Sequence, residues 1–438
     1  MFPLYDQTRR QICMAAFLGL CVLPTLAVTG WSIARHTSWH RQAEEQRLGY
    51  ELGLDVTVGA LKHLTPGVVR YEDLKLSDPE TGQCLLQCAA VDATWTSMTD
   101  SHDQQRPAIV LAVSQADCEA ASWLRLSEVL RRRLECRDGR PEIEVRLSAD
   151  QFTLHNAAQS HALENVEGGI GLTPGGIQAR LSFRLSGGTA TEPIQMRIVR
   201  NRQVSPPSNG FDLDTRRVAV PCRLLALFDK DLQSLGPDCR FSGTVSSYET
   251  ASGWCGDLSG QLLGVDLAQV ACGRTIDEIT GTADVTVKRA KFLHGRLEEM
   301  DGWILAGPGT LGNSTVESLT AHLGISRATE LASGNPSLSF DRLGVQFWLD
   351  SRGVTLAGCC DEKSGAVAVS GGRVLLGSPP SQSQPIAALI QALVPVSSAP
   401  ANAVPATRQS SWLSQMLPMP NAAAGPQQPA SRGGENRK

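Results

Sequence analysis

The sequence Phe241-Ser-Gly243-Thr-Val245 decides the fold, because it returns as Leu258-Ser-Gly260-Gln-Leu262, Ile279-Thr-Gly281-Thr-Ala283 and Met300-Asp-Gly302-Trp-Ile304. Each copy places a polar residue and a glycine between apolar ones, and the glycines are 17, 21 and 21 residues apart. A period of that length holds two strands and two turns, so the repeat predicts stacked hairpins in a meandering antiparallel sheet. Fragments at residues 166–170 and 356–358 extend the pattern on both sides. The alternative is chance recurrence of a loose pattern in a glycine-rich chain.

Strands on either side of the repeat alternate between apolar and polar residues. One face of residues 177–185 is apolar, and so is one face of residues 345–349. Successive side chains of a strand point to opposite faces, so these strands have one apolar and one polar face. A sheet of such strands has to cover its apolar face with a second sheet, with helices or with a ligand. The candidate residues for contact with a ligand are Ile177, Leu181, Phe183, Leu185, Val345, Phe347 and Leu349.

The composition favours a folded, mainly β chain. Hydrophobic residues make up 42%, charged residues 19%, and the formal net charge is -4, which gives no reason to expect disorder or nucleic acid as a partner. The 41 glycines, the 24 prolines and the low aromatic content of 5% are typical of many short strands joined by turns. Short helices are predicted at residues 123–134, 221–234, 314–323 and 386–393, and a disordered tail at residues 396–438.

Residues 11–34 contain no charged side chain, and they are long and apolar enough to cross a bilayer as a helix. A cleaved signal peptide is the alternative, but the apolar core is long for one and Trp31 and Trp39 fit an interfacial belt. The chain then divides into a cytoplasmic head (1–11), a transmembrane anchor (12–34), a juxtamembrane linker (35–50), a β-rich domain (51–395) and the tail (396–438).

The charges that flank this segment give its orientation. Arg9 and Arg10 favour a cytoplasmic N-terminus, whereas Arg35, Arg41 and Arg47 weaken the asymmetry. The bulk of the chain is therefore expected outside the cytoplasm, anchored by a single pass in the inner membrane. Ten of the twelve cysteines lie beyond the segment, and they are interpreted as buried free thiols, with a few disulfides as the alternative.

Sequence signals for catalysis are weak. Gly307-Pro-Gly309-Thr-Leu-Gly312 matches a dinucleotide fingerprint, but Pro308 lacks an amide donor and no alternation of strands and helices surrounds it, so a turn is favoured over a nucleotide site. Cys255 with His294 or His322 is a possible nucleophile and base, although a strand cysteine is the simpler interpretation.

Metal and acid–base signals are weaker still. His36 and His40 have no third metal ligand nearby, and Asp277–Glu278, Glu298–Glu299 and Asp361–Glu362 are adjacent, so in strands they would point to opposite faces. We therefore expect no enzyme, no cofactor and no metal, and an exported hydrolase is the third and weakest hypothesis.

The first part of the β-rich domain resembles the opening of AsmA-like envelope proteins. The similarity lies in Glu51-Leu-Gly-Leu-Asp-Val-Thr-Val58, Pro66-Gly-Val-Val-Arg-Tyr-Glu-Asp-Leu-Lys-Leu76 and Asp78-Pro-Glu-Thr-Gly82-Gln-Cys-Leu-Leu86, which together with residues 12–34 give a membrane helix followed by a strand, a glycine turn and a second strand. The later hairpins and short helices are similar in style across residues 12–375.

The resemblance implies a long antiparallel sheet curled into a trough whose apolar face carries lipid acyl chains, as in AsmA-like and TamB-like proteins. The fold expected is thus an N-terminal transmembrane helix and an elongated antiparallel sheet of repeated hairpins, as an open groove or a sandwich, with a few short helices. The expected function is non-enzymatic lipid handling, with membrane phospholipid as the partner. The alternative is a membrane-tethered β scaffold that binds another envelope protein.

Overall fold

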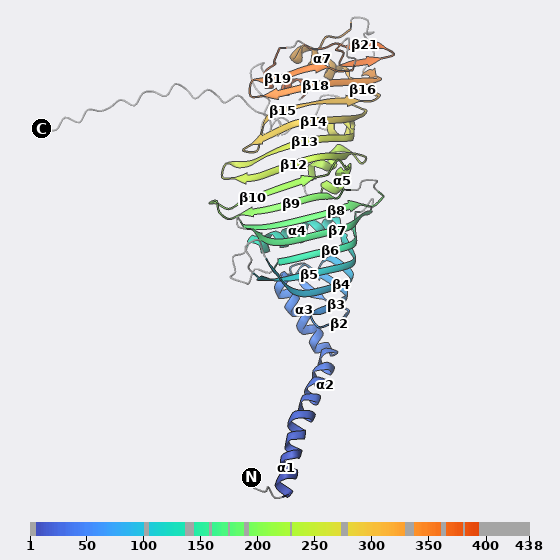
Figure 1. The fold of residues 1–438 in the computed structure, drawn as a ribbon. Helices are drawn as coiled ribbons and strands as arrows, with labels where there is room; N and C mark the ends of the chain where they lie inside the picture. Colours follow the sequence, from blue (N-terminus) through green and yellow to red (C-terminus); the bar gives the residue numbers. More distant parts are fainter. Residues whose placement is uncertain are drawn as a thin grey trace, which may run out of the picture. The chain divides into compact units, whose positions relative to one another are not determined.

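The structure, a computed structural model, describes residues 6–99, 105–135, 144–156, 160–173, 176–187, 192–227, 230–272, 279–328, 337–360, 365–379 and 382–393. It is mainly β, with one long N-terminal helix and a few short helices, as the sequence predicts (Figure 1). The chain forms two compact units, Met1–Thr191 and Glu192–Lys438. The predicted tail at residues 396–438 lies outside the described residues.

The long N-terminal helix has three parts: α1 (Asp6–Phe17), the π-helical turn η1 (Leu18–Val22) and α2 (Leu23–Arg35). The π-helical turn ends two residues before Pro24, which has no backbone N–H to donate to the preceding turn, and the wider turn accommodates that gap. The 27 residues Arg9–Arg35 are long and apolar enough to cross a membrane. The prediction of one such helix at this place is confirmed.

Most of the predicted linker is a helix, α3 (Ser38–Leu52). Thr37 caps its N-terminus and Gly53, in the left-handed region at φ 70°, ends it. The Glu45 carboxylate accepts the Val58 N–H at 2.8 Å, and the Arg41 guanidinium donates to the Gly59 carbonyl at 3.0 Å. These two bonds fix α3 to the first strands of the sheet.

The sheet of the first unit is formed by the chain in sequence order. β1 and β2 both pair with β3, and the ladder continues from β3 through β4, β5, β6 and β7 to β8. The strands are β1 (Asp55–Thr57), β2 (Ala60–Thr65), β3 (Val68–Ser77), β4 (Cys84–Thr99), β5 (Gln105–Glu119), β6 (Glu144–His155), β7 (Ser160–Thr173) and β8 (Gly176–Leu185).

The predicted meander is interrupted once in this unit. β5 and β6 pair in parallel, because α4 (Ala120–Glu135) returns the chain to the edge at which β5 began. The other strand pairs that the structure describes in this unit are antiparallel. The helix predicted at residues 123–134 is thus α4, three residues longer at its start and one at its end.

The main sheet of the second unit is an antiparallel ladder through β9, β10, β12, β13, β14, β15, β18 and β19. β11 also pairs with β12, β20 pairs with β18 and β21, and β16 pairs with β17 in a separate small sheet. The strands are β9 (Ile194–Asn201), β10 (Ser208–Asp214), β11 (Val220–Pro221), β12 (Arg240–Thr250), β13 (Gly253–Asp266), β14 (Thr282–Leu293), β15 (Arg296–Ala306), β16 (Gly309–Gly312), β17 (Ser337–Phe340), β18 (Arg342–Asp350), β19 (Gly353–Gly358), β20 (Ala368–Ser370) and β21 (Arg373–Leu376).

The helices of the second unit are short. They are α5 (Cys222–Leu225), the 3-10 helix η2 (Lys230–Leu235), α6 (Leu267–Ala271), α7 (Asn313–Leu323) and α8 (Ile386–Leu393). The helices predicted at residues 314–323 and 386–393 are confirmed, and α7 begins one residue earlier, at Asn313. The helix predicted at residues 221–234 is wrong in extent: Pro221 still belongs to β11, and only α5 and η2 are helical.

Three glycines of the repeat share one row of the second unit's sheet. Gly243 pairs with Gly260, Gly260 with Val287, and Val287 with Gly302. A Cβ atom at Gly243 would lie 2.2 Å from the Ser259 carbonyl oxygen, so the strands approach more closely than any side chain allows.

The Ile279 copy of the repeat differs from the other three. Gly281 precedes β14 at φ 120° beside Pro308, and Ile279 makes an isolated bridge to Leu311. Three of the four sequence copies therefore place their glycine in the same row of the sheet, and the Ile279 copy does not.

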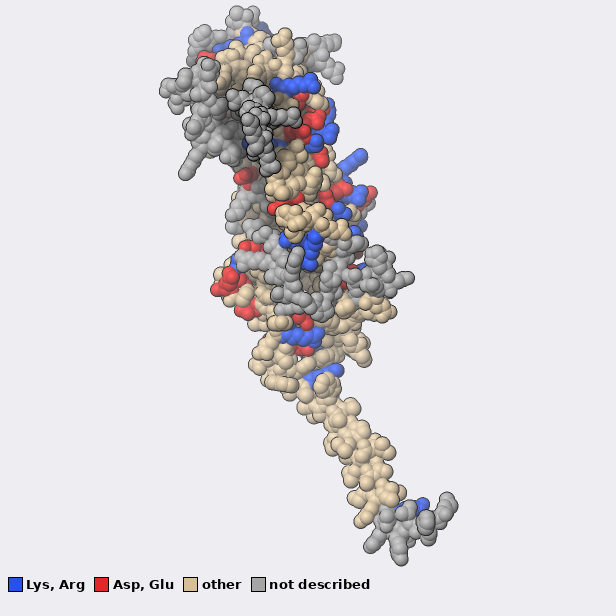
Figure 2. Space-filling model, turned by 90° about the vertical axis from the view of Figure 1, so that its left-hand side faces the viewer, with Lys and Arg blue, Asp and Glu red and all other residues tan. Residues whose placement is uncertain are grey.

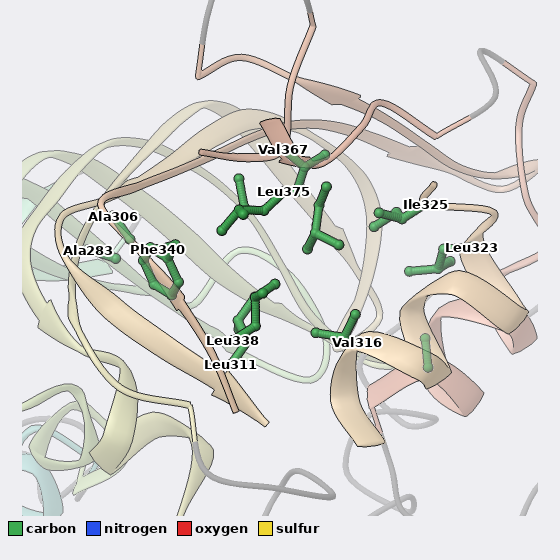
Figure 3. Close-up of a cluster of buried hydrophobic side chains, with 13 residues drawn as sticks. Ala283, Ala306, Leu311, Val316, Leu323, Ile325, Leu338, Phe340, Val367 and Leu375 are labelled. Carbon is green, nitrogen blue, oxygen red and sulfur yellow. The ribbon is translucent and has the colours of Figure 1, made fainter. Parts of the chain in front are cut away.

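A buried cluster closes one part of the second unit (Figure 3). Val316 and Leu323 of α7, Leu338 and Phe340 of β17 and Ala392 of α8 contribute to it. α7, α8 and the small β16–β17 sheet thus cover the apolar face of this part of the main sheet. The cover is made of helices and a small two-stranded sheet, not of a second large sheet.

Candidate functional site

Apolar residues form continuous rows across the sheet of the first unit. One row runs from Ala93 through Leu111 and Leu147 to Gly168 and Leu181, each the cross-strand partner of the next. A second row consists of Trp95, Ile109, Val145, Ile170 and Ala179. We call the face of the sheet that carries these rows the inner face.

A crease crosses this sheet where the alternation of buried residues slips by one position. In each strand from β3 to β7, two buried residues are three positions apart instead of two. The pairs are Tyr71 and Leu74, Cys88 and Val91, Val113 and Ala116, Ala149 and Phe152, and Leu163 and Val166.

The crease lies at the same register in all five strands. Tyr71 pairs with Val91, which pairs with Val113, and the row continues to Ala149 and Val166. At the crease, the two outermost of these strands each contain one residue in the left-handed region, Asp73 at φ 51° and Asn165 at φ 50°. Asp and Asn tolerate this conformation better than most residues. The alternation thus restarts at this line, so that buried residues on both sides of it belong to the same face of the sheet.

On one side of the crease, α4 packs on the inner face. The Trp123 ring of α4 meets the Phe152 ring of β6 edge-on at 5.8 Å between centroids, and Leu126 is buried beneath the helix. Arg125 fixes the helix to the loop after β3, because its Nε donates to the Asp78 carboxylate at 2.7 Å. That hydrogen bond lowers the pKa of the buried Asp78 carboxyl, which therefore stays charged.

On the other side of the crease, the apolar rows are covered only in part. Leu111, Leu147 and Leu181 are half-buried, and so are the five residues of the Trp95 row. A Cβ atom at Gly168 would lie 3.5 Å from Leu181 and 3.7 Å from Leu147, so the two leucines flank the space above this glycine. The part of the chain that the structure describes leaves these rows partly open.

α3 forms the border of the half-buried rows next to the membrane helix. The Arg47 guanidinium of α3 lies over the Trp95 ring, 4.6 Å from its centroid. Burial raises the pKa of Tyr71 to about 12, so this phenol is neutral at the edge of the inner face. Only His36 and Thr37 separate α3 from the end of α2 at Arg35.

The candidate residues predicted in β8 are distributed over this face. Phe183 is fully buried at 5% exposure, whereas Ile177, Leu181 and Leu185 are half-buried. The strand departs from strict alternation at Gln178, which is buried. Leu181 is thus the predicted residue that lies in the half-buried Leu111 row.

The candidate residues predicted in β18 lie under the chain's own helices and strands. Leu349 is 5% exposed and belongs to a cluster with Ile386 and Ile390 of α8. Val345 packs against the cluster shown in Figure 3. Phe347 is half-buried, and its ring lies over Gly302, 2.9 Å from where a Cβ would be. A ligand could reach Leu349 only after α8 had moved.

The structure places the predicted fingerprint Gly307–Gly312 in a different context from a dinucleotide site. Gly307 and Pro308 connect β15 to β16, and Gly309–Gly312 is β16 itself, paired antiparallel with β17. A dinucleotide site needs the glycines in a turn between a parallel strand and a helix. The turn interpretation applies to Gly307 and Pro308, and Gly309 and Gly312 are strand residues.

The predicted pair of Cys255 and His294 is not brought together among the described contacts. Cys255 is 3% exposed in β13, and the Thr250 hydroxyl lies 3.9 Å from its sulfur. His294, in the β14–β15 turn at φ 55°, contacts the exposed Ser252 hydroxyl through Nδ1 at 2.5 Å. Cys255 thus occupies the position of a packed strand cysteine.

His36 and His40 do not share a helix face, because α2 ends at Arg35 and α3 begins at Ser38. His40 instead stacks on His63 of β2, with their Nε2 atoms 3.1 Å apart, a contact for which the sequence has no signal. Burial, together with the charge of Arg35, lowers the pKa of His63. No group of three or more metal-ligating side chains occurs among the described residues.

The predicted carboxylate pairs do not form an acid–base site among the described residues. Glu298 and Glu299 pair separately with Lys291 and Arg289. Asp277–Glu278 and Asp361–Glu362 lie outside the described residues. Acidic and basic side chains of the described residues are mixed on the face seen in Figure 2.

No protein-family model, curated protein or solved structure matches the chain.

Proposed function

We propose that this chain is a membrane-anchored, non-enzymatic protein that holds lipid acyl chains on the half-buried inner face of its first unit. The observation that supports this most is that the Leu111 and Trp95 rows continue beyond the cover of α4. Leu111, Leu147 and Leu181 are apolar, adjacent and partly open. These features agree with the predicted resemblance to AsmA-like proteins.

The proposed mechanism is passive. An acyl chain that lies along the rows loses contact with water, and each buried methylene contributes about 0.8 kcal/mol. No reacting group is required, because the free energy comes from the apolar area alone. In this proposal the membrane helix keeps the inner face next to the bilayer from which the lipid comes, with α3 at the border between them.

The proposed placement is the inner membrane, with an uncleaved anchor, a cytoplasmic head and both units outside the cytoplasm. Arg9 and Arg10 support this orientation through the preference of basic residues for the cytoplasmic side. The outer membrane of the cells is permeabilised while the inner membrane stays closed. A protease added to such cells should then degrade both units. Protection of both units in that experiment would contradict the orientation.

Photo-crosslinking tests the lipid proposal with a matched control on the same strand. A benzophenone amino acid at Leu147 points to the inner face, and the same amino acid at Ser148, which is exposed, points to the outer face. After illumination in native membranes, we expect a phospholipid adduct at Leu147 and not at Ser148. Equal adducts at both positions would indicate contact with bulk lipid instead, and adducts at neither would contradict the proposal.

A second measurement concerns affinity. Leu111→Asp places a carboxylate in the half-buried row, and Ala112→Asp places the same group on the exposed face of the same strand. Native mass spectrometry after mild detergent extraction should show phospholipid bound to the unaltered chain and to Ala112→Asp, and loss of it in Leu111→Asp. Retention of lipid by Leu111→Asp would argue against this face as the binding site.

A second candidate function is a tethered scaffold that binds another envelope protein. Exposed aromatic residues in the second unit favour it: Tyr248 is 52% exposed, Trp254 47% and Trp348 44%. Aromatic residues are enriched at protein interfaces, and α3 would then serve only as a tether. If this function holds, Trp254→Ser and Trp348→Ser should abolish crosslinking to a partner protein, and a benzophenone amino acid at Leu147 should give no lipid adduct.

A further inference from the structure

Two cysteines face each other where the second unit's sheet meets its first short helix. β11 and β12 are antiparallel, with Val220 opposite Phe241 and Pro221 opposite Arg240. The next position in this register places Cys222 opposite Cys239. The Cys222 N–H donates to the Cys239 carbonyl at 2.8 Å, which continues the ladder by one more pair.

The side chains of this pair are in contact. The two sulfur atoms are 2.7 Å apart, and both cysteines are 0% exposed. A disulfide needs sulfurs about 2.05 Å apart and Cα atoms about 4.4–6.8 Å apart, and directly opposed residues of an antiparallel pair have Cα atoms about 4.5–5.5 Å apart. Closing the bond therefore requires a movement of the sulfurs of less than about 1 Å and no change of register.

We propose that Cys222 and Cys239 form a disulfide when the second unit folds outside the cytoplasm. This inference depends on the proposed extracytoplasmic placement, because thiols in the cytoplasm are kept reduced. The two cysteines are 17 positions apart in the sequence, so the disulfide closes a covalent loop that contains α5 and η2.

The oxidant is a protein disulfide of the dithiol–disulfide oxidoreductase class. One cysteine thiolate attacks that disulfide, forms a mixed disulfide and releases one thiolate of the donor. The second cysteine thiolate then attacks the mixed disulfide, which forms the Cys222–Cys239 bond and releases the other thiolate of the donor. The donor gains two electrons and two protons, and this chain loses them. Both sulfurs are buried in the folded unit, so the exchange precedes the packing of α5 on the sheet.

The disulfide fixes a cover of the second unit's sheet. Leu224 and Leu227, in the loop that it closes, are 4% and 8% exposed, and Phe241 of β12, opposite Val220, is 6% exposed. α5 has only four residues, which is too short for a helix to be stable by itself. A covalent bond from its first residue to the residue before β12 holds this short cover in place.

Peptide mapping of the full-length chain tests the proposal. Membranes are quenched in acid, denatured and alkylated without a reductant, and the chain is digested with trypsin. The peptides 218–223 and 231–240 should be recovered as one linked species in which neither cysteine is alkylated. Reduction should separate the two peptides. Cys255, buried in β13, is the control for a thiol that should be alkylated. Cys222→Ser should abolish the linked species and make Cys239 fully alkylated.

Different failures identify different errors. If both peptides are alkylated as free thiols in cells, and also after purified chain is refolded in a glutathione redox buffer, the pairing is wrong. If the link forms in the buffer but not in cells, the disulfide is absent from the living protein and the proposed extracytoplasmic placement fails while the geometry stands. A link from Cys222 to any other cysteine also overturns the proposal.

Discussion

A methyl group at Gly302 should destabilise the second unit by forcing two strands apart. A Cβ there would lie 2.2 Å from the Thr286 carbonyl oxygen in β14 and 2.9 Å from the Phe347 ring in β18. The backbone oxygen cannot rotate away, so β14 and β15 have to separate locally. Overpacking a buried position costs about 1–3 kcal/mol, and the backbone contact places Gly302→Ala near about 3 kcal/mol.

Thermal unfolding of the full chain in detergent, followed by the β signal in circular dichroism, measures this cost. In a unit of this size 1 kcal/mol shifts Tm by about 2–4 °C, so a decrease of about 6–12 °C is expected. Gly307→Ala is the control, because the nearest atom to its Cβ is the Thr282 oxygen at 3.9 Å. Its change should stay within about 1 kcal/mol, since Gly→Ala at an unstrained position stabilises slightly.

Two results would refute this reasoning. The first is an equal Tm for Gly302→Ala and Gly307→Ala, which would mean that β14 and β15 are not in close contact at this row. The second is complete rescue of Gly302→Ala by Phe347→Leu, because the smaller side chain relieves only the contact with the ring. The contact with the Thr286 oxygen should leave most of the loss in place.

Three further perturbations concern the first unit. Asn165→Gly should leave its stability almost unchanged, whereas Asn165→Val should cost about 1–2 kcal/mol in urea unfolding, because φ is 50° at this end of the crease. The pKa of Asp78 is lowered by Arg125, so its contribution to stability is present above the unfolded-state pKa and is lost as pH falls through the folded-state pKa. Asp78→Asn should therefore be less stable than the unaltered chain at neutral pH, and urea midpoints measured across acidic pH should converge. Leu126→Ala should cost about 2–5 kcal/mol and raise hydrogen exchange in β5 and β6, since Leu126 is 6% exposed beneath α4; unchanged exchange would show that α4 does not protect these strands.

Alternation along β18 was sufficient to predict which of its residues share a face. In β18 the sequence places Gln346 and Trp348 on one face and Leu349 on the other, and in the structure Gln346 and Trp348 are exposed and Leu349 is buried. Periodicity does not state what covers a face. Leu349 is covered by α8, which follows it by nearly forty residues and reads in the sequence as an independent apolar helix.

Features that depend on several strands at once could not be predicted. The crease needs the burial pattern to slip by one position in five strands at the same register, and Asp73 and Asn165 look like ordinary polar strand residues until their partners are known. The contact between His40 and His63 requires α3 to lie against β2, which no local pattern indicates. The half-buried rows likewise appear only when Leu111, Leu147 and Leu181 are aligned.

The parallel pairing of β5 with β6 has a consequence for the order of folding. Ala108 pairs with Glu144, which is 36 residues further on, whereas His155 and Ser160 close the β6–β7 hairpin across 5 residues. Loop-closure entropy makes the longer closure more costly by about 1.7 kcal/mol. The three-stranded antiparallel groups β3–β5 and β6–β8 can therefore form separately, and their joining waits until α4 is placed. Slower refolding of Leu126→Ala, with little change in its unfolding rate, would identify this joining as the rate-limiting step.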